Sequence, residues 1–362
     1  MHRLVLAAAV AACARGAPGL VASRAAASRS AVAKAGVYDY MTQESSPVVF
    51  NGRLLMLESI PREYANRDPR LAACDNYMRV RDMETLGVVV SLLASCNHSF
   101  GAAFVYANAD GADTFVVSAT PWDRHGAWSG PCSGGASCSV DLLWSSSPTL
   151  EESSWTARVP GIPFPGFGIY NQDIMPVPAS AALPFRWAMA IETTQEKARF
   201  AVSASADPTN TSAWALLNAS FTVPPWPDTG SCPSLRHDGE FFYYLTGGKN
   251  IHIMRSPDLL GWQESATDVL VFSDPGDCIV APSWFGPYVP TGEALQRLQT
   301  CGPAGTFGDD SDVDLVEWTR PFGSNGPPIV LLEYGSGDQR TFGFSNLAIF
   351  NGTMIEFLRS FF

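Results

Sequence analysis

The sequence is poor in positive charge, and it has no long apolar run beyond its first residues. Its 362 residues contain 23 lysines and arginines against 35 aspartates and glutamates, which gives a net charge of −12. An acidic surface repels phosphate backbones and anionic lipid headgroups. No later apolar stretch is long enough to cross a bilayer. We therefore expect neither nucleic acid nor a membrane as a partner.

Closely spaced cysteine pairs are also missing. None of the eight cysteines has the Cys-x-x-Cys spacing that is typical of zinc sites, so the sequence predicts no metal site and no cofactor. Seven cysteines lie beyond the N-terminal segment, and in an exported protein an odd number leaves at least one unpaired or linked to another chain. Cys132 and Cys138 flank a loop rich in glycine and serine, and we expect a disulfide between them.

The first 38 residues differ in composition from the rest. They contain five basic residues and no acidic one, and an apolar run leads into the small-x-small pattern Ala-Cys-Ala at 12–14. This order predicts a secretory signal. We therefore expect a signal or targeting segment at 1–38, an exported protein and a single domain at 39–362, with a plastid-type transit extension as the alternative. Glycosylation sequons agree with the secretory route and lie at Asn97, Asn210, Asn218 and Asn351.

A repeated unit indicates the architecture. Three segments each contain an apolar strand, one or more serines, a short turn and then a tryptophan, at Trp155, Trp214 and Trp262. A period near 50 residues, with short alternating strands and no long amphipathic helix, is typical of propeller blades. We expect these three tryptophans to be buried at related positions in successive blades.

Hairpin signals divide the chain into five such units. Asp-Gly at 238–239 and Asn-Gly at 51–52 each lie between apolar runs, where glycine supplies the positive φ of a tight turn. The sequence therefore predicts an all-β fold, a five-bladed β-propeller. A β-sandwich is the alternative, but sandwiches lack a repeated strand-Ser-turn-Trp unit. The blades are expected to begin near residues 45, 99, 170, 231 and 311.

The fourth unit carries a more specific pattern. Its segments 241–245 (Phe-Phe-Tyr-Tyr-Leu) and 255–262 (Arg-Ser-Pro-Asp-Leu-Leu-Gly-Trp) resemble a signature of the five-bladed propeller glycosidases of the arabinanase, xylosidase and invertase group. Blades of that group read Asp-Gly-x-Tyr-Tyr-Leu and then Arg-Ser-x-Asp-Leu-x-x-Trp. The resemblance covers blades two to four well and the first and fifth blades more loosely.

The resemblance implies a carbohydrate-active protein with an oligo- or polysaccharide substrate, and we expect it to act as a secreted monomer. It also implies that the first strand of each blade lines the central axis and opens into the substrate pocket. Glycoside cleavage needs one carboxyl group to protonate the leaving oxygen and a second to activate water or attack directly. These carboxylates are therefore expected at the pocket ends of the inner strands.

Two of the three carboxylates found in the resembled enzymes are absent. The first-blade position, an Asp before a Pro, is Ser46 here, and the fourth-blade Glu, two residues before a Pro, is Ser231. Only the third-blade position keeps an acid, at Asp173. The sequence is therefore compatible with two functions, that of a hydrolase with rearranged carboxylates and that of a catalytically inactive glycan-binding propeller. A protein-interaction propeller is a third possible class, but it would not explain why acidic residues face the central axis.

Other acidic residues stand near the expected pocket. Asp312 and Asp314 open the fifth blade on one face of the strand, and glutamates follow the second strands of blades one, three and five. We expect catalytic roles for Asp173, Asp312 and Glu192. Roles in substrate binding are expected for Arg236, Asp314, Glu58 and Glu333.

Structural roles are the alternative for several of these residues. Glu58 and Glu333 would equally suit contacts between blades, and Asp312-x-Asp314 would suit a structural calcium in the axis. His98, inside a sequon and beside Cys96, is expected to be structural. Tryptophans in loops are the candidates for stacking on sugar rings, and these are Trp122, Trp128 and Trp226.

Overall fold

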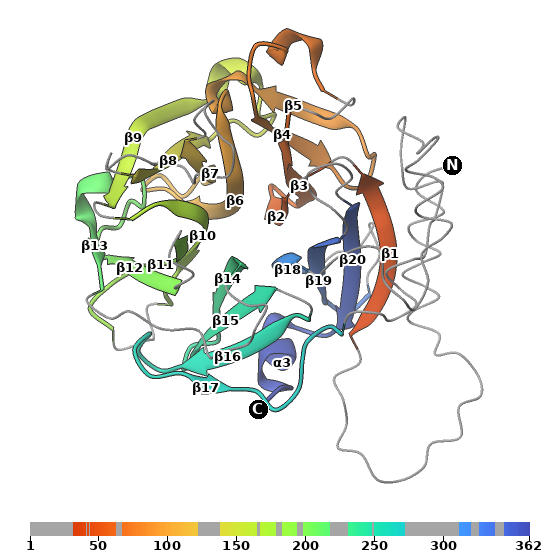
Figure 1. Cartoon of the computed structure of the whole chain (residues 1–362), viewed down its shortest axis with the longest axis vertical. Helices are drawn as coiled ribbons and strands as arrows, with labels where there is room; N and C mark the ends of the chain where they lie inside the picture. The colour runs from red at the N-terminus through yellow and green to blue at the C-terminus, as the bar shows by residue number, and fades with distance from the viewer. Residues whose placement is uncertain are drawn as a thin grey trace.

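The chain forms a ring of five antiparallel sheets, each with four strands (Figure 1). The computed structural model describes residues 32–40, 42, 44–62, 67–121, 138–164, 167–178, 183–193, 198–217, 231–247, 250–271, 311–319, 326–336 and 344–362. The fold class expected from the sequence, a five-bladed β-propeller, is confirmed. Residues 1–31, Cys132 and the three loop tryptophans Trp122, Trp128 and Trp226 lie outside the described residues.

The first four blades each follow the chain from the inner to the outer strand. Blade 1 contains β2 (Ser45–Phe50), β3 (Arg53–Ile60), β4 (Tyr77–Asp82) and β5 (Val88–Leu92). Blade 2 contains β6 (His98–Ala107), β7 (Asp113–Pro121), β8 (Cys138–Ser145) and β9 (Thr156–Phe164). Blade 3 contains β10 (Ile169–Pro176), β11 (Trp187–Thr193), β12 (Ala198–Ser203) and β13 (Trp214–Leu216). Blade 4 contains β14 (Ser231–His237), β15 (Phe242–Gly247), β16 (His252–Ser256) and β17 (Gln263–Glu264).

The fifth blade joins the two ends of the ring. Its strands β18 (Ser311–Trp318), β19 (Ile329–Ser336) and β20 (Phe344–Asn351) are followed by β1 (Ala33–Tyr40), which pairs with β20 in an antiparallel ladder. The structure therefore corrects the boundary expected at 38, because Ala33–Tyr40 already belongs to the propeller. The physical reason is ring closure, because this strand from the start of the chain pairs with β20 as the fourth strand of the last sheet.

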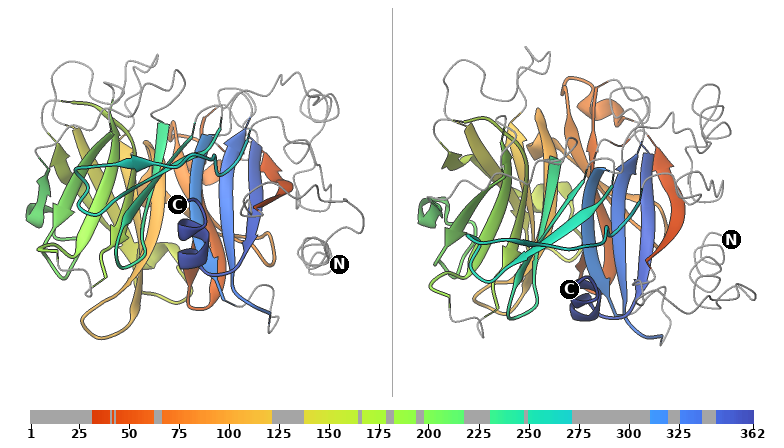
Figure 2. Two further views of the ribbon diagram at one scale, coloured as in Figure 1. Left: turned by 90° about the horizontal axis from the view of Figure 1, so that it is seen from below. Right: turned by 60° about the horizontal axis from the view of Figure 1, so that its bottom comes forward.

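Apolar clusters fill the space between neighbouring blades. One buried cluster lies at each of the five interfaces, so every blade packs two faces. The short helix α3 (Met354–Arg359) lies near the C-terminus (Figure 2). It begins with a capping box at Thr353 and packs Phe357 and Leu358 into the cluster between blades 4 and 5. In the described part of the chain, no helix is both long and apolar enough to cross a membrane.

The repeated tryptophans close the turns at the outer edges of their blades. The sequence predicted that Trp155, Trp214 and Trp262 are buried, but the structure leaves all three half-buried, and each packs one side on an interblade cluster. Their indole N–H groups donate to backbone carbonyls of Leu150, Pro208 and Leu259, 2.9–3.3 Å away. Each indole ring binds a turn at the surface, so one side of the ring stays exposed there.

Bulges shape the pocket ends of the inner strands. The register shifts near the N-terminal ends of β6, β10, β14 and β18. Left-handed backbone occurs there at Phe100, Cys232 and Asp312, with φ of 56°, 60° and 56°. A bulge bends its strand and redirects the side chains that follow. The residues at these strand ends consequently face one another across the axis.

A disulfide that the sequence reasoning missed ties two loops of blade 1. Cys74 and Cys96 are bonded, with their Cα atoms 5.1 Å apart and a sequence separation of 22. The pairing expected between Cys132 and Cys138 stays a prediction, because Cys132 and the Cys138 side chain lie outside the described residues.

Removing this disulfide is expected to destabilise the propeller. A crosslink that closes a loop of about 20 residues restricts the unfolded chain and contributes roughly 3 kcal/mol. The double variant Cys74→Ser/Cys96→Ser should lower the free energy of unfolding by about that amount, as measured by urea denaturation. An unchanged midpoint with an unchanged slope would show that the bond does not form in the protein.

Candidate functional site

A narrow acidic cavity lies on the axis where the inner strands begin. Its volume is about 40 Å³. Each blade contributes to its wall at the start of its inner strand, and the polar lining side chains are Glu44, Ser45, Ser46, Asn171, Gln172, Asp173, Cys232, Asp312 and Asp314. Three carboxylates expected from the sequence, at Asp173, Asp312 and Asp314, are thus brought to one cavity.

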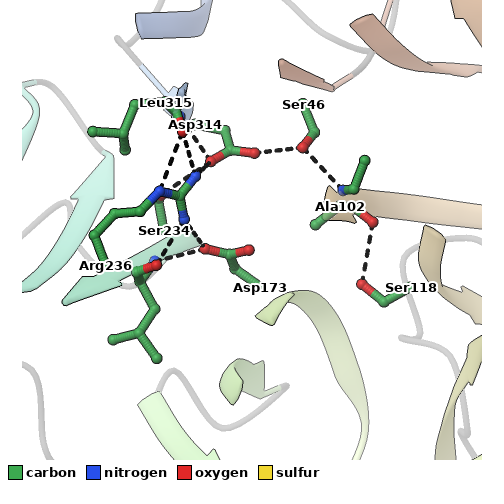
Figure 3. Close-up of polar contacts among 10 residues, drawn as sticks. Ser46, Ala102, Ser118, Asp173, Ser234, Arg236, Asp314 and Leu315 are labelled. Carbon is green, nitrogen blue, oxygen red and sulfur yellow. Dashed lines mark hydrogen bonds and ion pairs between the residues drawn. The ribbon is translucent and has the colours of Figure 1, made fainter. Parts of the chain in front are cut away.

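One arginine joins two of these carboxylates. Arg236, on the inner strand of blade 4, donates from Nη1 to Asp173 Oδ2 at 2.7 Å and from Nη2 to Asp314 Oδ1 (Figure 3). The backbone N–H of Leu235 donates to the same Asp173 oxygen at 2.7 Å. Because both carboxylates accept from the same guanidinium group, they lie close to each other.

Asp314 is held by further donors from two neighbouring blades. The Ser46 hydroxyl of blade 1 donates to its Oδ2, and the Ser234 hydroxyl of blade 4 donates to its Oδ1 at 3.0 Å (Figure 3). The backbone N–H of the next residue, Leu315, also donates to Oδ1 at 2.7 Å. Together with Arg236, these groups surround the carboxylate of Asp314 with donors that complement a negative charge.

Burial dominates the electrostatics of Asp173. The side chain is almost fully enclosed, and burial raises the pKa of its carboxyl to about 7. The Arg236 guanidinium lowers this pKa, whereas the Asp314 carboxylate raises it again. A carboxyl group in such surroundings can carry a proton near neutral pH, as a general acid must.

A second group of side chains surrounds the Cys232 thiol. The thiol donates to Asp312 Oδ1, and its sulfur accepts from Asn171 Nδ2 at 2.8 Å. Glu192 Oε2 accepts from the same Asn171 amide at 2.8 Å and from the backbone N–H of Cys232 at 2.9 Å. The expected catalytic residues Asp312 and Glu192 are therefore joined through Cys232 rather than through Asp173.

Burial dominates the electrostatics of the acids in this second group. Burial raises the pKa of Glu192 to about 8, and burial together with Glu192 raises that of Asp312 well above its usual range. Glu44, which sequence reasoning did not select, is buried beside them. Burial first, and then the charges of Asp312, Glu192 and Glu333, hold its pKa well above normal.

Four of the predicted site residues do not line the cavity, namely Glu192 and Arg236, which contact residues that do, and Glu58 and Glu333. Glu58 is completely buried and forms ion pairs with Arg79 and with Arg81, the latter at 2.8 Å. Burial alone would raise its pKa, but the two arginines more than offset this effect and lower it. These contacts give Glu58 a structural role, but they lie within blade 1 and not between neighbouring blades, as the structural alternative had expected.

Glu333 occupies the equivalent position in blade 5, opposite Asp314 in the strand ladder. It is buried, and neither of its oxygens makes a hydrogen bond of normal geometry among the described residues. Burial, followed by the charges of Asp312 and Asp314, raises its pKa well above normal. Glu333 therefore adds to the acidic character of the axis from behind the cavity wall.

Comparisons with known proteins bear on the fold. No protein-family model matches the sequence, and no curated protein matches it significantly. Among solved structures, the chain is similar to a xylan β-1,4-xylosidase from Bacillus halodurans, with 12% identity, a TM-score of 0.49, and 86% of this chain and 53% of that chain covered. This chain thus spans about half the length of the xylosidase.

An exo-1,5-α-L-arabinanase from a bovine ruminal metagenomic library is also similar. It shares 8% identity, with 88% of this chain and 93% of that chain covered and a TM-score of 0.47. At these identities, the activity of neither enzyme transfers to this chain.

Proposed function

We propose that the protein is a carbohydrate-active propeller that hydrolyses glycosidic bonds at its axial cavity. The observation that carries this proposal is the pair Asp173 and Asp314, which belong to different blades and share the guanidinium of Arg236 beside the cavity. Glycoside hydrolysis requires two carboxyl groups a short distance apart, one as acid and one as base or nucleophile.

The donors around each carboxylate support a division of roles. Asp314 accepts from Ser46, Ser234, Arg236 and the N–H of Leu315, which suits a carboxylate that stays ionised and activates water or attacks. Asp173 is the proposed proton donor to the leaving oxygen. Arg236 fixes the orientation of both groups.

Asp314 also lies close to the position where the resembled enzymes carry an acid that this sequence lacks. The resembled enzymes carry an Asp where this chain has Ser46, and the Ser46 hydroxyl donates to Asp314 Oδ2. An Asp314 oxygen is therefore within hydrogen-bond distance of the Ser46 side chain. We infer that a carboxylate from blade 5 takes the place of the one that blade 1 supplies in the resembled enzymes.

The substrate and location follow from the same proposal. An oligo- or polysaccharide is the proposed substrate, and the protein is proposed to act as an exported monomer that binds neither nucleic acid nor membrane. The Cys74–Cys96 disulfide supports export, because disulfides persist in oxidising compartments and are rare in the cytosol. The sequons at Asn97, Asn210, Asn218 and Asn351 would then be sites of glycan attachment.

A catalytically inactive glycan-binding propeller is the second candidate. It is favoured by the hydrogen bonds that the two carboxylates already accept. Asp173 Oδ2 accepts from Leu235 N–H and Arg236, and Asp314 Oδ1 accepts from Arg236. In this case the cavity would present fixed acceptors to sugar hydroxyls without transferring a proton.

Substituting the paired aspartates is expected to abolish hydrolysis. General acid or base catalysis contributes about 10²–10⁴-fold, so Asp173→Asn and Asp314→Asn should each lower kcat/KM by at least about 100-fold. Each variant leaves Arg236 with one carboxylate partner but removes a charge from a buried ion pair, so the thermal midpoint should also fall, and activity is measured below the midpoint of each variant. Cleavage of a panel of aryl glycosides and plant polysaccharides by the purified full chain provides the measurement.

Asp141→Asn is the matched control for this experiment. Asp141 is also fully buried and accepts from Ser139 and from the N–H of Gly161, with His98 Nε2 at 3.0 Å, but it does not line the cavity. It should retain wild-type turnover. Full activity in both Asp173→Asn and Asp314→Asn would refute the assigned pair. Glycan binding without turnover in the wild type would establish the second candidate instead.

A further inference from the structure

We propose that the axial cavity holds a thiophilic divalent metal ion of the zinc class, bound by Glu44, Cys232 and Asp312. One ligand atom from each of these side chains lies within 4.8 Å of the other two, and all three residues are buried. In a tetrahedral zinc site, bonds of about 2.0–2.3 Å place ligand atoms roughly 3–4 Å apart. The three side chains therefore need only small movements to bind one ion.

The ligands come from three different parts of the ring. Glu44 precedes β2, whereas Cys232 and Asp312 are the second residues of the inner strands β14 and β18. The last two occupy equivalent left-handed positions in their bulges. An ion at this point would tie the first, fourth and fifth blades together at the axis.

Asn171 provides independent support for a ligand at this position. Its side chain is only 8% exposed and lines the same cavity, and its Oδ1 is buried with no hydrogen-bond partner. Its Nδ2 already contacts Cys232 Sγ at 2.8 Å. A half-turn about the terminal torsion of the amide would direct Oδ1 to the ion as a fourth ligand, in exchange for the present Nδ2 hydrogen bond to Glu192 Oε2.

Charge balance favours an ion at the same place. Glu44 and Asp312 are both buried within ligand distance of each other, and a third carboxylate, that of Glu192, contacts the backbone N–H of Cys232 beside them. Buried carboxylates of this kind must either keep protons or pair with a cation. A divalent ion would displace protons from Glu44, Asp312 and the Cys232 thiol as it binds.

The chemistry of the ligands selects the kind of metal. Calcium and magnesium bind oxygen ligands, whereas a thiolate favours zinc and similar softer ions. The calcium site considered from Asp312-x-Asp314 does not fit, because the Asp314 carboxylate is engaged with Arg236, Ser46 and Ser234. The proposed ion therefore uses Asp312 without Asp314. The proposal does not depend on glycosidase activity.

Titration with cadmium tests the site directly. The purified full chain is treated with a chelator, dialysed, and titrated with Cd²⁺ while the ultraviolet thiolate-to-cadmium charge-transfer band is followed. We expect a band that saturates at one equivalent per chain. Zn²⁺ should displace this cadmium and raise the thermal midpoint of the chelated protein, because an ion that binds only the folded state stabilises it.

Cys232→Ser and Asp141→Asn serve as the variant and its matched control. Cys232→Ser preserves size and should remove the saturating band and weaken zinc binding by more than about 10-fold, while Asp141→Asn should behave like the wild type. The cadmium titration of the wild-type protein remains a valid test even if the Cys232→Ser protein folds poorly. No one-equivalent band in the wild type, or an unchanged band in a folded Cys232→Ser protein, would overturn the proposal. Neither readout depends on glycoside cleavage.

Discussion

Glu58→Ala is expected to lower the free energy of unfolding by about 3–5 kcal/mol. The substitution leaves Arg79 and Arg81, which are 1% and 2% exposed, without the carboxylate that lies between them. Removing one partner from a buried ion pair has a cost of this size because the remaining charge cannot be hydrated. Urea denaturation of the variant and the wild type measures the difference.

A double-mutant cycle separates charge from packing in this experiment. Glu58→Ala combined with Arg79→Met should cost much less than the sum of the two single changes, because fewer buried charges remain unpaired. Additive losses would show that the ion pair contributes nothing.

The pH dependence of stability gives a second check on Glu58. Its pKa is lowered in the folded state, so its contribution is complete above the unfolded pKa of about 4.3 and is lost as the pH falls through the folded value. Glu58→Gln should therefore lose less stability than the wild type when the pH is lowered through this window. Parallel acid profiles of the two proteins would contradict the assignment.

Deleting the first strand is expected to prevent stable folding. Tyr38 and Val37 in β1 are almost completely buried, and Tyr38 belongs to the cluster between blades 5 and 1. Burial of two such side chains contributes roughly 3–6 kcal/mol, and the backbone ladder to β20 adds to this. The total is comparable with the whole stability of a typical domain. A chain that begins at residue 42 should lack a cooperative thermal transition.

A chain that begins at residue 32 is the control, and it should unfold at the temperature of the mature protein. A synthetic peptide of residues 32–40 should restore the cooperative transition when it is added to the shortened chain. Normal stability of the shortened chain without the peptide would show that β1 is dispensable.

The repeat made the architecture predictable from sequence. Each inner strand starts within one residue of the expected positions, because turns such as Asp238-Gly239 and Asn51-Gly52 encode local geometry. The closing strand β1 was not recognised. Its residues lie within a segment that has the composition of a targeting sequence, and its partner β20 is about 300 residues away.

The site was less predictable than the fold. The repeat positions led to Asp173, Asp314 and Arg236, which the structure places in contact. Which acid faces which depends on the bulges and on contacts between blades, so the pairing of Asp312 with Cys232 left no local signal. The proposed metal ligands come from distant blades, and no short spacing motif could reveal them.

Ring closure by β1 also sets the order of events during synthesis. The first strand of the propeller leaves the ribosome, or crosses a membrane during export, long before its partner β20 exists. Until then β1 and the neighbouring faces of blade 1 are unpaired, and exposed strand edges of this kind are prone to pair with other chains. The last sheet cannot close until nearly the whole sequence has been made. A chaperone that shields nascent chains would therefore act mainly on this earliest segment.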